Sequence, residues 1–240
     1  MKKMKCVLIV IFVGVLMVTS MACSNNPSSG NMENKENSEQ TAASTEAASE
    51  AVKLNNTYTT RFQEVNAVTY PPFMFDYPDN WKISQEVVTP ETEKVTLEND
   101  RGVEIKYAYF GYPKGYNFGT STVSMTRVDV SKVENSNFKP GKVQGTDHSE
   151  LGPFMVAKLK VTGNLKMKTD FDYTVVDGPV SYAVLPESQI GTVEGIRGPF
   201  EGEFSFWYSG YVSFTSSAPD GEFTDEEQRE VNTILASFRN

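Results

Sequence analysis

The chain has 240 residues, with 22 Lys and Arg against 31 Asp and Glu, one His, two Cys and a formal net charge of -9. This length accommodates one domain of ordinary size with extensions, or two small ones. The acidic excess argues against a nucleic-acid partner, and two Cys with one His cannot build a zinc cluster, so we expect neither a metal nor a cofactor.

The N-terminus has the layout of a secretory signal peptide. Lys2, Lys3 and Lys5 precede an apolar run over residues 7–18, and small residues then lead to a cleavage point after Ala22. The alternative is a transmembrane helix, but residues 7–22 number only 16, short of the roughly 20 that a span requires. We therefore predict a signal peptide over residues 1–22.

The segment Ser20-Met21-Ala22-Cys23 resembles a bacterial lipobox, although Ser20 stands where that motif prefers Leu. The resemblance implies a bacterial lipoprotein with a diacylglyceryl group on Cys23. Acyl chains such as palmitate would then hold it on the outer side of the cell membrane without a spanning helix. A plain secreted protein is the alternative. Removal of residues 1–22 would change the net charge from -9 to -12.

Residues 23–56 are expected to form the lipidated cysteine and a disordered tether. No aromatic residue lies between Phe12 and Tyr58, and Ser, Asn, Glu, Thr and Ala dominate. Such a segment cannot bury enough apolar surface to offset the entropy that ordering costs.

Residues 57–240 are expected to form a single α+β domain, because they hold all but one of the aromatic residues. Apolar and polar residues alternate at the period of a strand, as in Val103, Ile105, Tyr107 and Tyr109. A slip in this alternation predicts a β-bulge near residues 126–127. Strands are expected over 73–77, 94–98, 103–109, 121–130, 157–161, 173–176, 181–185, 204–208 and 210–216.

One helix is predicted to close the chain. Thr224 is a favourable N-cap, and Glu227 three residues later completes a capping box. An apolar stripe follows at helical spacing, formed by Val231, Ile234, Leu235 and Phe238. We therefore predict an antiparallel β-sheet with this C-terminal helix docked on one face.

Two segments of the domain resemble the PsbP-like superfamily. They are residues 75–83, which contain Tyr77-Pro78 followed by Trp81, and residues 234–238, which end in Ser237-Phe238. The resemblance implies an α/β/α sandwich around an antiparallel sheet. It also implies binding, accessory or assembly roles rather than one chemistry. Residues 84–150 depart from the family's pattern.

The region 107–119 is the most distinctive candidate for binding. Its aromatic side chains alternate with glycines, and such rings stack on sugars or grip a partner protein when they are exposed. The alternative is a hairpin whose rings fold back onto the core, which the alternation at Tyr107 and Tyr109 favours. The candidate binding residues are Phe110, Tyr112, Tyr116 and Phe118, and a surface extension by Trp207, Tyr208 and Tyr211 is conceivable.

The other candidates have weaker support. His148 lies beside Asp147 and Ser149, but sequence neighbours do not form a catalytic triad and no Gly-x-Ser-x-Gly motif occurs, so we expect a solvated loop histidine. Acidic residues able to bind a hard cation lack EF-hand spacing. They are Asp170, Asp172, Asp220, Glu222, Asp225, Glu226 and Glu227.

Together these features favour a membrane-anchored extracytoplasmic lipoprotein with a non-catalytic binding or accessory domain. Its partner would be a protein or a cell-wall component. The alternatives are a carboxylate-dependent envelope hydrolase, which requires a cleft with two facing acids, and a small-molecule carrier, which requires an apolar cavity.

Overall fold

The computed structural model describes residues 51–65, 70–110, 124–166, 173–174, 178–197 and 204–240. The chain divides into two units, Met1–Ala48 and Ser49–Asn240. All described residues belong to the second unit, so the expected signal peptide, Cys23 and nearly all of the tether lie outside them.

A ten-stranded sheet in which every strand pairs antiparallel to its neighbours dominates the second unit. The strand order is β12-β6-β9-β11-β14-β5-β4-β3, while β10 pairs with β9 and β13 pairs with β14. The strands are β3 (Lys82–Val88), β4 (Thr92–Glu98), β5 (Glu104–Phe110), β6 (Ser124–Asn135), β9 (Phe154–Lys166), β10 (Tyr173–Thr174), β11 (Val180–Pro186), β12 (Gly191–Arg197), β13 (Phe206–Trp207) and β14 (Tyr211–Ser217).

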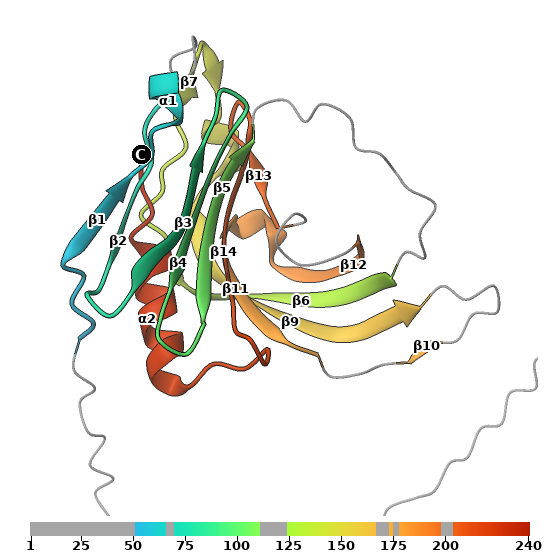
Figure 1. Ribbon diagram of the computed structural model, residues 1–240. Helices are drawn as coiled ribbons and strands as arrows, with labels where there is room; N and C mark the ends of the chain where they lie inside the picture. The colour runs from blue at the N-terminus through green and yellow to red at the C-terminus, as the bar shows by residue number, and fades with distance from the viewer. Residues whose placement is uncertain (1–50, 66–69, 111–123, 167–172, 175–177, 198–203) are drawn as a thin grey trace, which may run out of the picture. The chain divides into compact units, whose positions relative to one another are not determined.

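Smaller elements surround this sheet. Two strand pairs stand apart from it, β1 (Asn56–Thr59) with β2 (Met74–Tyr77) and β7 (Lys142–Val143) with β8 (Thr146–Asp147). The helices are α1 (Phe62–Val65), α2 (Asp225–Ala236) and the 3₁₀ turns η1 (Ser149–Leu151) and η2 (Glu187–Gln189). Figure 1 shows β3, β4, β5 and β14 running upright while β6 and β9 run across the view, so the sheet bends strongly.

The predicted C-terminal helix is confirmed as α2. The Thr224 side chain accepts a hydrogen bond from the Glu227 backbone N–H, and the Glu227 side chain accepts one from the Thr224 backbone N–H. Val231, Ile234 and Leu235 are fully buried. These are the reciprocal cap and the apolar stripe that the sequence predicts, and they dock α2 on the sheet.

The main hydrophobic core lies between α2 and the sheet. Phe238, just after α2, is fully buried, and its ring centroid lies 5.1 to 5.4 Å from those of Phe73, Phe138 and Phe214. Tyr107 enters the same core from β5. Aromatic contacts at these separations add to the stabilisation from buried apolar area.

A second apolar cluster occupies the opposite face of β6, β9 and β11. In β9, Phe154 and Val156 join the main core, whereas Met155, Ala157 and Leu159 join the second cluster. Successive side chains of a strand point to opposite faces, so the first four residues of β9 are buried on both. This explains its nearly continuous apolar sequence.

Several predicted strands needed correction at their bounds. The bulge is confirmed, because the register of β6 against β9 shifts between Arg127 and Val128. The predicted strand over 204–208 is shorter, because Phe206–Trp207 are the residues that pair. Phe204 packs into the second cluster, whereas Phe206 packs into the main core. The predicted strands omitted β1, β3, β7, β8 and β12 altogether.

Candidate functional site

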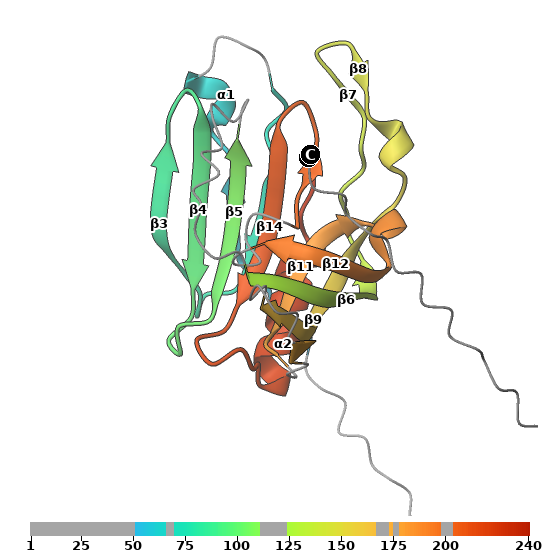
Figure 2. The same cartoon turned by 90° about the vertical axis from the view of Figure 1, so that its right-hand side faces the viewer.

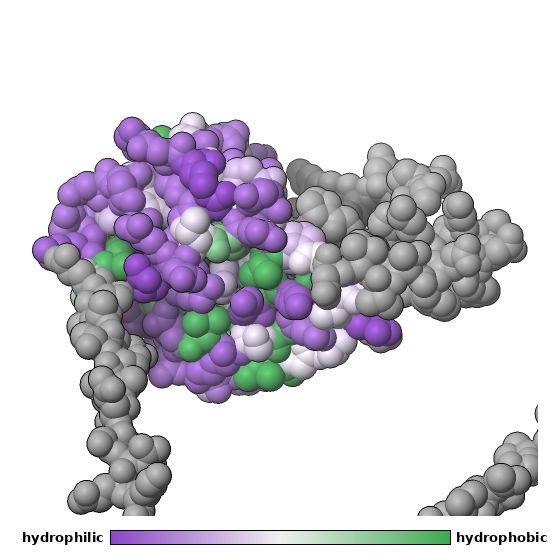
Figure 3. All heavy atoms as spheres, turned by 90° about the horizontal axis from the view of Figure 1, so that it is seen from below, coloured by the Kyte–Doolittle hydropathy of each residue, from purple (hydrophilic) through white to green (hydrophobic). Residues whose placement is uncertain are grey.

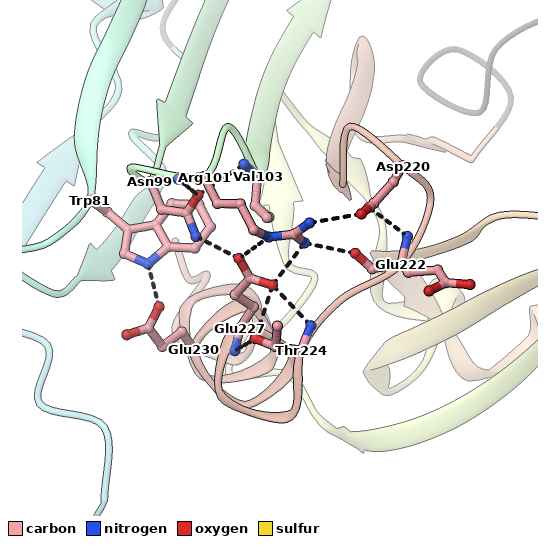
Figure 4. A network of polar contacts seen from close by, with 9 residues as sticks. All are labelled: Trp81, Asn99, Arg101, Val103, Asp220, Glu222, Thr224, Glu227 and Glu230. Atoms are coloured by element: carbon pink, nitrogen blue, oxygen red, sulfur yellow. Dashed lines mark hydrogen bonds and ion pairs between the residues drawn. The ribbon is translucent and has the colours of Figure 1, made fainter.

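The acidic residues near α2 are held in an ion-paired network, shown in Figure 4. Glu227 accepts hydrogen bonds from Arg101 Nε at 2.6 Å and Arg101 Nη2 at 2.8 Å, and Asp220 accepts one from Arg101 Nη1 at 3.0 Å. The hydrogen bonds from Arg101, followed by those from Thr224 and Asn99, outweigh burial and lower the pKa of Glu227 to about 2. The network therefore fastens the β4–β5 turn to the start of α2.

The tryptophan of the Tyr-Pro…Trp segment is bound to the same helix (Figure 4). Trp81 Nε1 donates to Glu230 Oε2 at 2.8 Å, and Asn80 Nδ2 donates to Glu230 Oε1 at 2.9 Å. Both oxygens of this buried carboxyl are thus satisfied, as a buried polar group requires. The contact is a docking interaction between the start of β3 and α2.

The domain end that carries this network shows no large apolar surface. Seen from below in Figure 3, hydrophilic residues dominate there, and hydrophobic ones form small separate patches. Larger continuous patches mark interaction sites. This end of the domain shows no such continuous patch among the residues that the structure describes.

Two carboxyl groups meet at the hydroxyl of Tyr58. Tyr58 Oη lies 2.8 Å from Glu86 Oε1 and 2.8 Å from Glu93 Oε1. Glu93 also accepts the backbone N–H groups of Arg61 and Phe62, and Arg61 Nη2 pairs with Glu86 at 2.8 Å. Burial raises the pKa of Glu93, and the hydrogen bonds only partly oppose it. The single phenolic proton of Tyr58 is therefore shared between two carboxyl acceptors.

This pair does not suit a hydrolase that uses two carboxylates. Glu93 is 0 % exposed, so no substrate atom reaches it. Its oxygens are occupied by the segment that joins β1 to α1. Among the residues that the structure describes, no three His, Cys, Asp or Glu side chains are placed to hold a metal ion, and no helix is both long and apolar enough to cross a bilayer.

A row of aromatic side chains, two of them exposed, crosses one end of the sheet. Trp207 pairs with Tyr211 across β13 and β14, and Tyr211 pairs with Phe110 across β14 and β5. Trp207 is 40 % exposed and Tyr211 is 43 % exposed, and their rings meet edge to face with centroids 5.0 Å apart. The Lys94 amine lies 5.1 Å from the Phe110 ring centroid. We call Trp207, Tyr211 and Phe110 the aromatic row.

The structure settles only part of the predicted aromatic surface. Tyr107 and Tyr109 are buried, so the rings of β5 that alternate inward do fold onto the core. Phe110 is half-buried on the other face. The candidates that lie outside the described residues are Tyr112, Tyr116, Phe118, Asp170, Asp172 and Cys23.

His148 is not the solvated loop residue that we expected. Its side chain is buried, its ring lies 4.7 Å from the Tyr208 ring, and its Nε2 lies 2.9 Å from Ser209 Oγ. The expectation failed because Ser209 is 61 residues away in the sequence. Figure 2 shows the β7–β8 hairpin at the upper end of the domain, and His148 follows directly after β8.

Ser209 occupies a tight turn between β13 and β14. Its φ of +55° is in the left-handed region, which non-glycine residues rarely adopt. The Tyr208 N–H donates to the Gly210 carbonyl at 2.7 Å, and Tyr109 Oη donates to the Ser209 carbonyl at 2.9 Å. Left-handed residues of this kind cost about 1–3 kcal/mol and cluster at functional sites. The sequence signal that could have predicted this turn is a serine between an aromatic residue and a glycine.

Comparison with known proteins does not identify the family of this chain. No protein family, curated protein or solved structure matches this chain.

Proposed function

We propose that the protein is a lipid-anchored extracytoplasmic lipoprotein whose β-rich domain is a binding or accessory module. The anchor would be Cys23, and the partner would be a protein or a component of the cell envelope. The lipobox-like segment before Cys23 and the signal-peptide layout of residues 1–22 support the location.

The observation that carries the binding role is the aromatic row. Large aromatic side chains dominate the binding energy of protein interfaces, and they lose little rotamer entropy when they are immobilised. The half-exposed side chains of Trp207 and Tyr211 are held edge to face by the β13–β14 pairing, so the surface is already ordered. The adjacent Lys94 amine adds a positive charge to an otherwise acidic protein.

A PsbP-like fold is part of this proposal. The antiparallel sheet with a C-terminal helix agrees with its coarser features. The two segments that carry the resemblance also meet in space, because Trp81 bonds to α2 through Glu230 and Asp76 N–H donates to Ser237 Oγ at 2.8 Å. The residues that carry the resemblance therefore have one structural role, which is to hold these two segments together.

The location is tested by fractionation of the native host. Cys23→Ala in the full chain should move the protein from the membrane fraction to the soluble fraction. An unchanged membrane fraction would contradict the lipid anchor.

The surface is tested by photocrosslinking in the native envelope. A photoreactive amino acid replacing Tyr211 should give a specific adduct, and Trp207→Ala should weaken that adduct. The matched control places the same probe at Ile190, which is 52 % exposed on a different segment. Equal adducts at both positions would argue against the aromatic row.

A further inference from the structure

The contact between His148 and Ser209 has the geometry of an activated nucleophile. A general base must lie within about 2.6–3.2 Å of the hydroxyl that it deprotonates. The observed separation of Nε2 and Oγ is 2.9 Å. With the ring proton on Nδ1, Nε2 accepts the hydrogen bond that Ser209 donates.

Both partners are held rigidly, which nucleophilic catalysis requires. The His148 N–H donates to the Gly141 carbonyl at 3.0 Å, and the imidazole lies against Tyr208. Tyr208 Oη in turn accepts the Gly141 N–H at 3.1 Å. The imidazole therefore has little freedom to turn away from Ser209.

The serine is fixed in an uncommon backbone conformation. The turn packs tightly onto Tyr109, since a Cβ added at Gly210 would lie 2.6 Å from the Tyr109 hydroxyl. A strained serine on a sharp turn beside a histidine is the arrangement by which unrelated hydrolases present their nucleophile. Here the strain is observed directly, as the φ of +55° at Ser209.

We propose that Ser209 and His148 form a dyad that cleaves esters, with Ser209 as nucleophile and His148 as general base. Among the described residues no carboxylate hydrogen-bonds to Nδ1, so Tyr208 and the backbone orient the ring in place of a third catalytic group. Trp207 and Tyr211 flank the turn in the sequence and are partly exposed. This inference does not rest on the proposed binding function, and it extends beyond a non-catalytic role.

The reaction proceeds in two balanced steps. Ser209 Oγ bonds to the ester carbonyl carbon while its proton passes to His148 Nε2, and the ester C–O bond breaks as the alcohol leaves with that proton. In the second step Nε2 takes a proton from water, and the resulting hydroxide attacks the acyl-serine. The C–Oγ bond then breaks, the carboxylic acid is released, and Oγ recovers the proton.

The test uses the full chain, solubilised from membranes, and a fluorescent fluorophosphonate probe that phosphonylates activated serines. Labelling should map to Ser209 by mass spectrometry, vanish in Ser209→Gly and fall at least tenfold in His148→Gln. Ser149→Ala, which removes an exposed neighbouring hydroxyl, is the matched control and should label normally.

Ser209→Gly keeps the test interpretable, because glycine adopts a positive φ without strain and the variant should fold. Thermal denaturation of each variant checks this. The dyad is refuted if the folded wild-type chain labels no faster than Ser209→Gly, or if labelling does not depend on His148. A contact that is purely structural would change only the melting temperatures, and that result would also overturn the proposal.

Discussion

Replacing Glu227 with glutamine should remove a large part of the domain's sensitivity to acid. A carboxyl whose pKa falls from 4.5 to about 2 on folding contributes about 3 kcal/mol at neutral pH. Because the folded pKa is the lower one, this contribution is complete above the unfolded pKa. It is lost as the pH falls through the window between about 4.5 and 2.

The assay is urea denaturation of wild type and Glu227→Gln at a series of pH values from 7 to 2. At pH 7 the variant should be less stable by about 3 kcal/mol, because glutamine cannot accept the paired bonds of Arg101 as a charged partner. The difference between the two proteins should shrink as the pH falls and nearly disappear at pH 2. Other acidic groups contribute equally to both proteins and cancel.

Glu226→Gln is the matched control, since Glu226 is the exposed neighbour on the same helical turn. It should change stability at pH 7 by only a few tenths of a kcal/mol, as a charge near a helix N-terminus does. The reasoning fails if Glu227→Gln and wild type differ by the same amount at pH 7 and pH 2. It also fails if both glutamine variants behave alike.

Three further substitutions test other parts of the structure. Burial raises the pKa of Glu93 in the folded chain, so wild-type stability should fall relative to Glu93→Gln as the pH rises above the unfolded value of about 4.5. A difference that does not change with pH would count against the raised pKa. Phe238→Ala should lower the free energy of unfolding by about 3–5 kcal/mol and the melting temperature by on the order of 10 °C, because it opens a cavity among three phenylalanine rings. A shift of only a degree or two would mean that the core repacks. Gly210→Ala should lower the free energy of unfolding by about 1–3 kcal/mol, because the added Cβ would lie 2.6 Å from the Tyr109 ring. Gly163→Ala is the control and should be less destabilising, because its added Cβ would meet nothing closer than 3.9 Å.

Local sequence patterns predicted the elements that local forces determine. The capping box at Thr224 and Glu227 depends on residues three positions apart, and the structure contains it as predicted. In β5 every second side chain is buried on one face, and the alternation of apolar and polar residues in the sequence predicts this face. In contrast, β3 was missed because it is an edge strand with mostly exposed side chains, so no buried face imposes a pattern on its sequence.

The candidate sites depend on contacts that no local pattern encodes. Arg101 pairs with Glu227 across 126 positions, and His148 meets Ser209 across 61. The sequence contains many acidic residues able to accept an arginine, and only the fold selects one. His148 was misjudged because polar neighbours in the chain suggested solvent, whereas a distant tyrosine ring covers it.

The strand pair β1–β2 determines where mechanical load would enter the domain. A chain anchored at Cys23, as we propose, is pulled from its N-terminal side, and β1 is the first strand to bear tension. Four residue pairs join β1 to β2, and Met74 of β2 exchanges backbone hydrogen bonds of 2.8 and 2.9 Å with Arg239 beyond α2. Force on the tether would therefore divide between two routes: β2 passes it to the C-terminal segment, and the hydrogen bonds of Tyr58 to Glu86 and Glu93 pass it to β3 and β4 at the edge of the ten-stranded sheet.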